Sequence, residues 1–103
     1  MTLRGDTSAI NNAGEFVNIQ LDGFYLRRPI SVCDVEGDVL TLIYKVVGKG
    51  TEAMARMSEG SKLRLLTGLG NGYDLTPSGD YPLLIGGGVG VPPMYLLAEK
   101  LLA

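Results

Sequence analysis

Leu26-Arg27-Arg28-Pro29-Ile30-Ser31-Val32 places two cations, a proline and a hydroxyl inside an otherwise apolar run. A strand that served only to fill a core would have little use for these side chains. Pro29 has no backbone N–H, so it predicts an edge strand or an interrupted ladder of hydrogen bonds. Arg28 and Ser31 can together hold a ligand with a phosphate and a polar ring edge. An edge strand with solvated arginines explains the same residues equally well.

The segments around this stretch predict β structure. Phe16–Leu21 alternates strictly, with its aliphatic side chains on one face. Val39–Val47 has two apolar faces, which predicts burial on both sides over part of its length. Fifteen glycines and five prolines imply many turns and favour β structure over a helical bundle. The other expected elements are a strand end at Met1–Arg4, an extended segment over Phe24–Val32, a hairpin turn at Glu36–Asp38, a strand over Lys62–Thr67 and a glycine-rich loop over Gly68–Asp74.

Composition argues against several kinds of site. A hydrophobic content of 46% excludes a disordered chain, and a net charge of -2 without a basic block argues against a nucleic-acid surface. The absence of histidine excludes Ser-His and Cys-His catalysis, and Cys33 alone cannot form a disulfide or a zinc or iron–sulfur site. No apolar run approaches the roughly 18–20 residues that cross a membrane, and Met1–Asp6 has no signal-peptide layout. We therefore expect a cytoplasmic protein.

Two further stretches can contribute to a ligand site, although each has an ordinary structural explanation. In Ile43-Tyr44-Lys45, the tyrosine can stack on a flat ring and the lysine can meet a phosphate. A core tyrosine beside an exposed lysine is the simpler interpretation. Gly48-Lys49-Gly50-Thr51 leads into a helix expected over Thr51–Met57, with Thr51 as its N-cap. Its glycines and helix start suit an anion, but it lacks Walker A spacing, and an ordinary strand-to-helix turn is the alternative.

The pattern changes near residue 80. Tyr81–Ile85 predicts a short buried parallel strand, and Val91–Leu102 predicts a helix with prolines in its first turn. Gly86-Gly87-Gly88-Val89-Gly90 joins them as in dinucleotide sites, although Pro93 stands where a third glycine would be. Close strand–helix packing through small residues is the alternative. We expect a β domain over residues 1–79 and the first βα unit of a truncated α/β domain over residues 80–103.

Such an orphan βα unit would leave apolar surface uncovered. Leu83–Ile85 and the apolar helix Met94–Leu102 have no partner strands to cover them within this sequence. We therefore expect self-association, or packing of this unit onto the barrel of its own or another copy.

The order of these motifs resembles the ferredoxin–NADP reductase superfamily, and within it the electron-transfer subunits of dihydroorotate dehydrogenase B. The resemblance covers nearly the whole chain, and Leu26–Ser31 and Leu84–Pro93 carry its most specific motifs. The other stretches that carry it are Gly14–Val17, Ile43–Val46, Gly48–Thr51 and Gly68–Gly72.

The resemblance implies a mainly β fold, a Greek-key antiparallel barrel that binds FAD, followed by a nucleotide-binding α/β domain for NAD. It implies a [2Fe-2S] cluster held by four cysteines. We expect that cluster only in the full-length protein, because its cysteines are absent from this sequence. It also implies a partner, the dihydroorotate dehydrogenase catalytic subunit, in pyrimidine biosynthesis. The barrel would lack its first strand, and the chain alone would not complete electron transfer.

By residue, the resemblance places Arg28 at the FAD pyrophosphate and Ser31 at the edge of the flavin ring. It requires no catalytic residue and no metal ligand from this chain, because the cofactor carries the chemistry. Two alternatives stay open: a reductase subunit of a sulfide dehydrogenase, glutamate synthase or hydrogenase, and a non-catalytic β-barrel interaction module. The residues assigned to FAD are Arg28, Pro29, Ile30, Ser31, Ile43, Tyr44, Lys45, Gly50 and Thr51, and those near NAD are Gly86, Gly87, Gly88 and Gly90.

Overall fold

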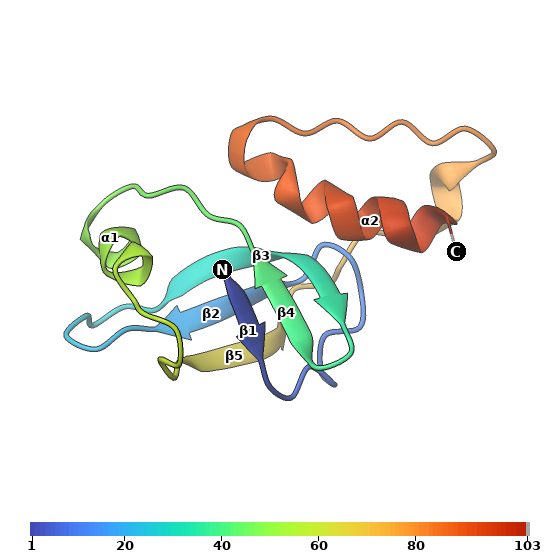
Figure 1. The fold of residues 1–103 in the computed structure, drawn as a ribbon. Helices are drawn as coiled ribbons and strands as arrows, with labels where there is room; N and C mark the ends of the chain where they lie inside the picture. The colour runs from blue at the N-terminus through green and yellow to red at the C-terminus, as the bar shows by residue number, and fades with distance from the viewer. Residues whose placement is uncertain (103) are drawn as a thin grey trace.

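The computed structural model describes residues 1–102 as a curved, five-stranded antiparallel sheet with two helices (Figure 1). The strand order is β1-β4-β3-β2-β5. Strands β2, β3 and β4 follow one another, and β5 returns through α1 to lie beside β2, which is a Greek-key arrangement. The expected mainly β fold is thereby confirmed. The elements are β1 (Thr2–Arg4), β2 (Phe16–Gln20), β3 (Arg28–Glu36), β4 (Val39–Leu42), α1 (Lys49–Ala55), β5 (Arg64–Leu69) and α2 (Pro92–Leu102), with short 3₁₀ turns at Thr76–Ser78 and Gly88–Gly90.

The core is built by the alternation of the strands and completed by residues of both helices. Val17 and Ile19 of β2 are fully buried, as their shared face predicts, while Gln20 is exposed. Helix α1 adds Met54 to the core, and α2 adds two leucines that pack against β3. The buried hydrophobic residues of the core are Ala13, Val17, Ile19, Leu21, Val32, Leu40, Leu42, Met54, Leu96 and Leu97.

Strand β3 changes its partner in the middle. Arg28–Ser31 pairs with β2, whereas the residues from Val32 onward pair with β4, with a register shift between Val32 and Asp34. The N–H of Val32 donates to the carbonyl of Glu15 at 3.1 Å, so Val32 and Glu15 form a hydrogen-bonded pair. Because such pairs alternate along an antiparallel ladder, the backbone of Pro29 points away from β2. Its missing N–H therefore costs no ladder bond, and the expected edge at Pro29 is confirmed, because β3 pairs with β4 only from Val32 onward. The segment before Arg28 is irregular, so the extended run expected from Phe24 begins later than its pattern indicated.

Strand β4 is shorter than expected. It ends at Leu42, whereas the sequence predicted one strand over Val39–Val47. The N–H of Leu42 bonds the carbonyl of Met1 at 2.8 Å, and β1 offers no partner beyond that point. The chain therefore leaves the sheet, and Ile43 is 54% exposed. The expected strand was therefore too long, and burial does not extend over residues 43–47 as it does over β4.

The other local expectations are largely confirmed. The β3–β4 hairpin turns through Gly37 and Asp38, with Gly37 at a positive φ of 60° that a glycine adopts easily. The N-terminal strand end is β1. Strand β5 runs two residues later at each end than the expected Lys62–Thr67. None of the helices described in residues 1–102 is long and apolar enough to cross a membrane.

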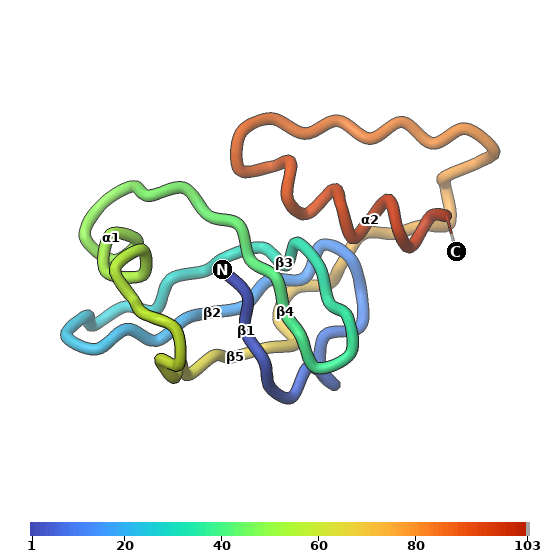
Figure 2. Tube along the Cα trace, in the orientation of Figure 1, coloured from blue at the N-terminus to red at the C-terminus, as the bar shows by residue number. Residues whose placement is uncertain are grey.

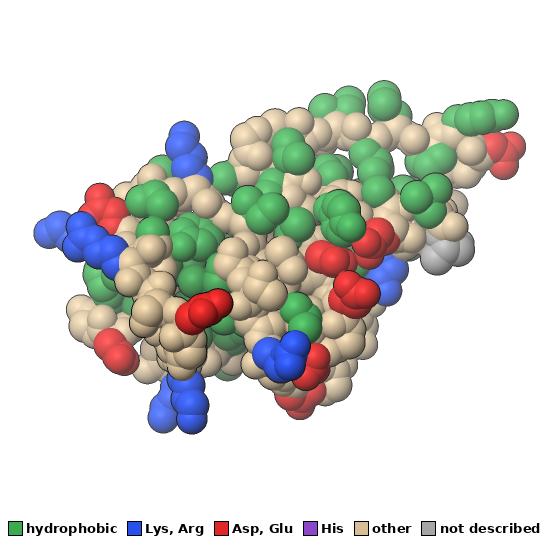
Figure 3. Space-filling view, in the orientation of Figure 1, with side chains coloured by type: hydrophobic (Ala, Val, Ile, Leu, Met, Phe, Trp, Pro, Cys, Tyr) green, Lys and Arg blue, Asp and Glu red, His purple; other side chains and the backbone are tan. Residues whose placement is uncertain are grey.

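The strand expected at Tyr81–Ile85 does not form. This segment runs as an irregular arm beside α2, far from any free strand edge that could pair with it (Figure 2). A parallel strand needs a neighbour to satisfy its backbone, and none reaches it. Leu83 and Ile85 are 82% and 80% exposed, and apolar side chains gather along the arm and α2 in Figure 3. Helix α2 itself packs on β3, so the expected packing onto the chain's own barrel is confirmed for the helix.

The neighbouring residues Leu42 and Ile43 test where β4 ends. Leu42→Ala removes a fully buried side chain and should lower the free energy of unfolding by about 2–5 kcal/mol. Ile43→Ala should change it by less than about 0.5 kcal/mol, because that side chain is half exposed. Urea unfolding followed by circular dichroism measures both. Equal losses would contradict the strand end at Leu42.

Candidate functional site

A cavity of about 430 Å³ opens beside the first half of β3. Ligand sites for small molecules commonly have volumes of roughly 300–1,000 Å³. All the residues that the sequence assigns to FAD line this cavity except Gly50, although they come from β3, the segment after β4 and α1. Its lining residues are Arg28, Pro29, Ile30, Ser31, Ile43, Tyr44, Lys45, Val47, Thr51 and Val89.

Gly50 lies directly against Arg28. A Cβ atom built on Gly50 would stand 2.8 Å from Cζ and 2.9 Å from Nη2 of Arg28, closer than real Cβ atoms approach other atoms. A glycine at this position leaves room for the guanidinium in its present place on the first turn of α1, and any side chain there would push the flexible end of Arg28 aside. The structure thus brings all nine residues together, eight on the cavity wall and one behind its arginine.

Arg28 is held by the protein but not neutralised. Its Cζ lies 5.1 Å from the centroid of the Phe24 ring, and its Nη1 donates to the carbonyl of Leu26 at 2.5 Å. Within residues 1–102, the one ion pair joins Arg4 and Asp38, so no carboxylate in that range pairs with Arg28. A guanidinium with free donors on a cavity wall is suited to a phosphate.

Ser31 offers polar groups of two kinds to the cavity. Its side chain is exposed and lines the cavity wall. Its backbone, like that of Pro29, points away from β2, and the pairing of β3 with β4 begins only at Val32. The hydroxyl and the main-chain groups of Ser31 can therefore bond the edge of a heteroaromatic ring.

Thr51 does not act as the expected N-cap. Helix α1 begins at Lys49, two residues before the expected start, and its N-cap is Gly48 at a φ of 97°. Thr51 lies inside the helix, where its Oγ1 accepts the N–H of Val47 at 2.7 Å and donates to the carbonyl of Gly48 at 3.2 Å. Because Gly48 occupies the N-cap, the Thr51 hydroxyl bonds the irregular segment that leads into the helix. Thr51 therefore fixes the segment that carries Ile43, Tyr44 and Lys45 along the cavity.

The glycine-rich turn before α2 contributes one side chain to the same cavity. Val89 lines it, whereas the surrounding Gly86, Gly87, Gly88 and Gly90 do not. The assignment of these glycines to NAD stays a prediction. Sequence reasoning missed Val47 and Val89 as cavity residues. The only signal for Val89 was its place as the single side chain in a run of glycines.

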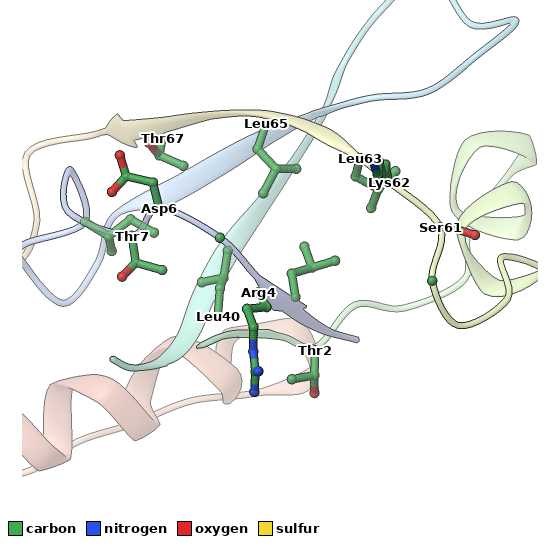
Figure 4. A pocket seen from close by; sticks show the side chains of 14 residues that line it. Thr2, Arg4, Asp6, Thr7, Leu40, Ser61, Lys62, Leu63, Leu65 and Thr67 are labelled. Carbon is green, nitrogen blue, oxygen red and sulfur yellow. The ribbon is translucent and has the colours of Figure 1, made fainter. Parts of the chain in front are cut away.

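A larger hollow of about 660 Å³ lies between β1 and β5, the two edges of the sheet (Figure 4). Leu63 and Leu65 point into it from the β5 side, and Leu3 and Leu40 line it as well. These edges do not pair with each other, so the sheet is a half-barrel that is open here. The hollow lacks the stacking side chains and unpaired guanidinium of the β3 cavity. We therefore take the smaller cavity as the candidate site.

Neither a thiol centre nor a metal centre competes with this cavity. Cys33 is buried at the bulge of β3, where burial raises the pKa of its thiol and the carboxylates of Asp34 and Glu99 raise it further. The unreactive protonated thiol is thereby favoured. Residues 1–102 contain no group of three or more His, Cys, Asp or Glu side chains that could hold a metal ion.

Comparison with known proteins gives one consistent result. No family model matches the chain. The "dihydroorotate dehydrogenase B (NAD(+)), electron transfer subunit" of Bacillus pumilus (strain SAFR-032) is 40% identical over 109 residues, which cover 98% of this chain and 42% of that protein. The proteins of the same name from Bacillus mycoides (strain KBAB4) and Streptococcus mutans serotype c are 40% and 41% identical, over 100% and 98% of this chain.

The chain is homologous to these electron transfer subunits. The resemblance seen in its motifs is thereby confirmed. The chain spans about 42% of the length of the dihydroorotate dehydrogenase B electron transfer subunits it matches. The similarity extends through the β3 motif and the glycine-rich turn, because it covers nearly the whole chain.

Thr51 provides a test of how the cavity wall is held. Thr51→Val keeps the shape of the side chain but removes the hydroxyl that accepts the Val47 N–H. The Thr51 side chain is only 7% exposed. The free energy of unfolding should fall by about 1–3 kcal/mol. Thr51→Ser keeps the hydroxyl and should lose less than half as much. Chemical denaturation of both variants measures this, and a Thr51→Ser loss as large as that of Thr51→Val would show that the methyl group, not the hydrogen bond, matters.

Proposed function

We propose that this chain supplies the FAD-binding barrel of a dihydroorotate dehydrogenase B electron transfer subunit. In this role it would pass electrons between NAD and a dihydroorotate dehydrogenase catalytic subunit. The observation that carries the proposal is the gathering of Arg28–Ser31, Ile43–Lys45 and Thr51 around one cavity, with Gly50 behind Arg28. The printed name of the relatives supports the NAD-linked electron-transfer role.

The chemistry of the cavity wall suits the parts of FAD. Arg28, without a carboxylate partner in residues 1–102, would neutralise the pyrophosphate, and Lys45 adds a second cation nearby. Ser31 would bond the polar edge of the ring through its hydroxyl and free main-chain groups. Tyr44 would stack on a flat ring system, and the aliphatic side chains of Ile30 and Ile43 would cover its apolar surface.

Bound FAD would supply the redox chemistry, since flavins accept and donate hydrides and single electrons. The residues of this chain would bind and orient the cofactor and exclude water from one side of it. No general acid or base is needed among them. The iron–sulfur cluster expected for the family cannot take its four cysteine ligands from these 103 residues, because Cys33 is their only cysteine.

The nearest alternative keeps the flavin site and changes the partner to a sulfide dehydrogenase, glutamate synthase or hydrogenase. The shared printed name of the relatives favours dihydroorotate dehydrogenase. Co-purification with a dihydroorotate dehydrogenase catalytic subunit distinguishes these, and reconstituted NAD-dependent dihydroorotate oxidation would decide for the first.

The neighbouring arginines Arg27 and Arg28 provide a matched test of the flavin site. Arg28→Ala removes the unpaired guanidinium and should weaken FAD binding by roughly 10- to 100-fold, the worth of a hydrogen bond to a charged group. Arg27→Ala should leave the Kd nearly unchanged, because Arg27 donates to Gln20 at 3.1 Å and does not line the cavity. Titration of the purified protein with FAD, followed by flavin fluorescence, measures both.

Gly50→Ala is the third variant in this series. Its methyl group would displace the Arg28 guanidinium from its present position, so it should weaken FAD binding although the residue itself does not line the cavity. A protein that stays colourless and takes up no FAD would overturn the proposal. Equal losses in the Arg27 and Arg28 variants would overturn the assignment of this cavity.

A further inference from the structure

Val89 is a cavity residue that the flavin motifs do not explain. It lies in the short turn before α2, yet it lines the same cavity as Arg28–Ser31 and Ile43–Lys45. It is the one side chain in Gly86-Gly87-Gly88-Val89-Gly90, so any side-chain contact from this segment to a ligand must come from it.

The turn holds Val89 in a defined position. The N–H of Gly90 donates to the carbonyl of Gly87 at 2.9 Å, and the N–H of Val91 donates to that of Gly88 at 3.2 Å. A Cβ atom on Gly86 would stand 3.0 Å from the carbonyl oxygen of Gly90 and from Cα of Val91, so the segment closes tightly on itself. Val89 therefore projects from a compact turn and not from an extended loop.

The helix that follows anchors this turn to the strand that carries the flavin motif. Pro92, Pro93, Leu96 and Leu97 are buried, and α2 packs on β3. The turn lies at the end of α2 where the arm returns to the helix (Figure 2). The position of Val89 on the cavity wall is therefore fixed by the packing of α2 on β3.

We propose that Val89 packs against the flavin ring bound in this cavity and shields one side of it from water. This inference rests on the proposed function. Val89 is 61% exposed without a ligand, so it has apolar surface left to bury against a flat aromatic ring. Gly88 and Gly90 on either side have open space at their Cβ positions, which lets the ring come close to the backbone. Val89 is thus the single branched side chain that this turn can place against the ring.

The test compares Val89→Ala with Val91→Ala in the purified protein titrated with FAD. Val91 belongs to the same turn and is 52% exposed, but it does not line the cavity. Val89→Ala should weaken FAD binding by roughly five- to tenfold, from the loss of two buried methyl groups, and Val91→Ala should leave it unchanged. Quenching of the bound flavin's fluorescence by iodide should also increase in Val89→Ala alone. Both variants should unfold at the wild-type temperature, because both side chains are exposed.

The outcomes separate this inference from the function on which it rests. Wild-type protein that binds FAD, with Val89→Ala weaker and more open to iodide, supports the contact. Wild-type binding with Val89→Ala equal to Val91→Ala overturns the contact and leaves the flavin site standing. Failure of the wild-type protein to bind FAD overturns both.

Discussion

The change of partner in the middle of β3 is the constraint on which the rest of the structure depends. Up to Ser31 the strand pairs with β2, and from Val32 it pairs with β4. One side of its first half is therefore left without a neighbouring strand. Pro29 is tolerated there because its backbone nitrogen faces the unpaired side. The cavity opens along that side, so the pairing that builds the core also creates the candidate site.

Three separate segments are then brought to this open side by packing. Strand β4 ends at Leu42, which sends Ile43, Tyr44 and Lys45 past β3 instead of along β1. The Thr51 hydroxyl fixes that segment to α1, whose Gly50 leaves room for the Arg28 guanidinium. Helix α2, seated on β3, brings the glycine-rich turn to the same place. A phosphate-bearing ring ligand would use both the Arg28 guanidinium, which has no carboxylate partner in residues 1–102, and the free edge of β3.

The sequence predicted the strands whose burial follows from the alternation of their own residues. It did not predict the features that depend on a neighbouring strand. The face of β2 with Val17 and Ile19 and the turn at Gly37 follow from local chemistry. The length of β4 depends on where β1 stops, and the strand expected at Tyr81–Ile85 depends on a neighbour that no residue pattern could supply. The family motifs named polar residues that line one cavity, whereas Val89 has no polar or aromatic chemistry to signal it. Thr51 was taken for a helix cap because the positive φ of Gly48 cannot be read from its type alone.

A crystal structure of the protein grown with FAD would show whether the β3 cavity holds the cofactor. We expect the pyrophosphate within hydrogen-bond distance of the Arg28 guanidinium, the edge of the flavin ring at Ser31, and the β3 pairing described above on either side of Val32. FAD bound instead in the hollow between β1 and β5, or Arg28 turned away from a ligand in the β3 cavity, would contradict it.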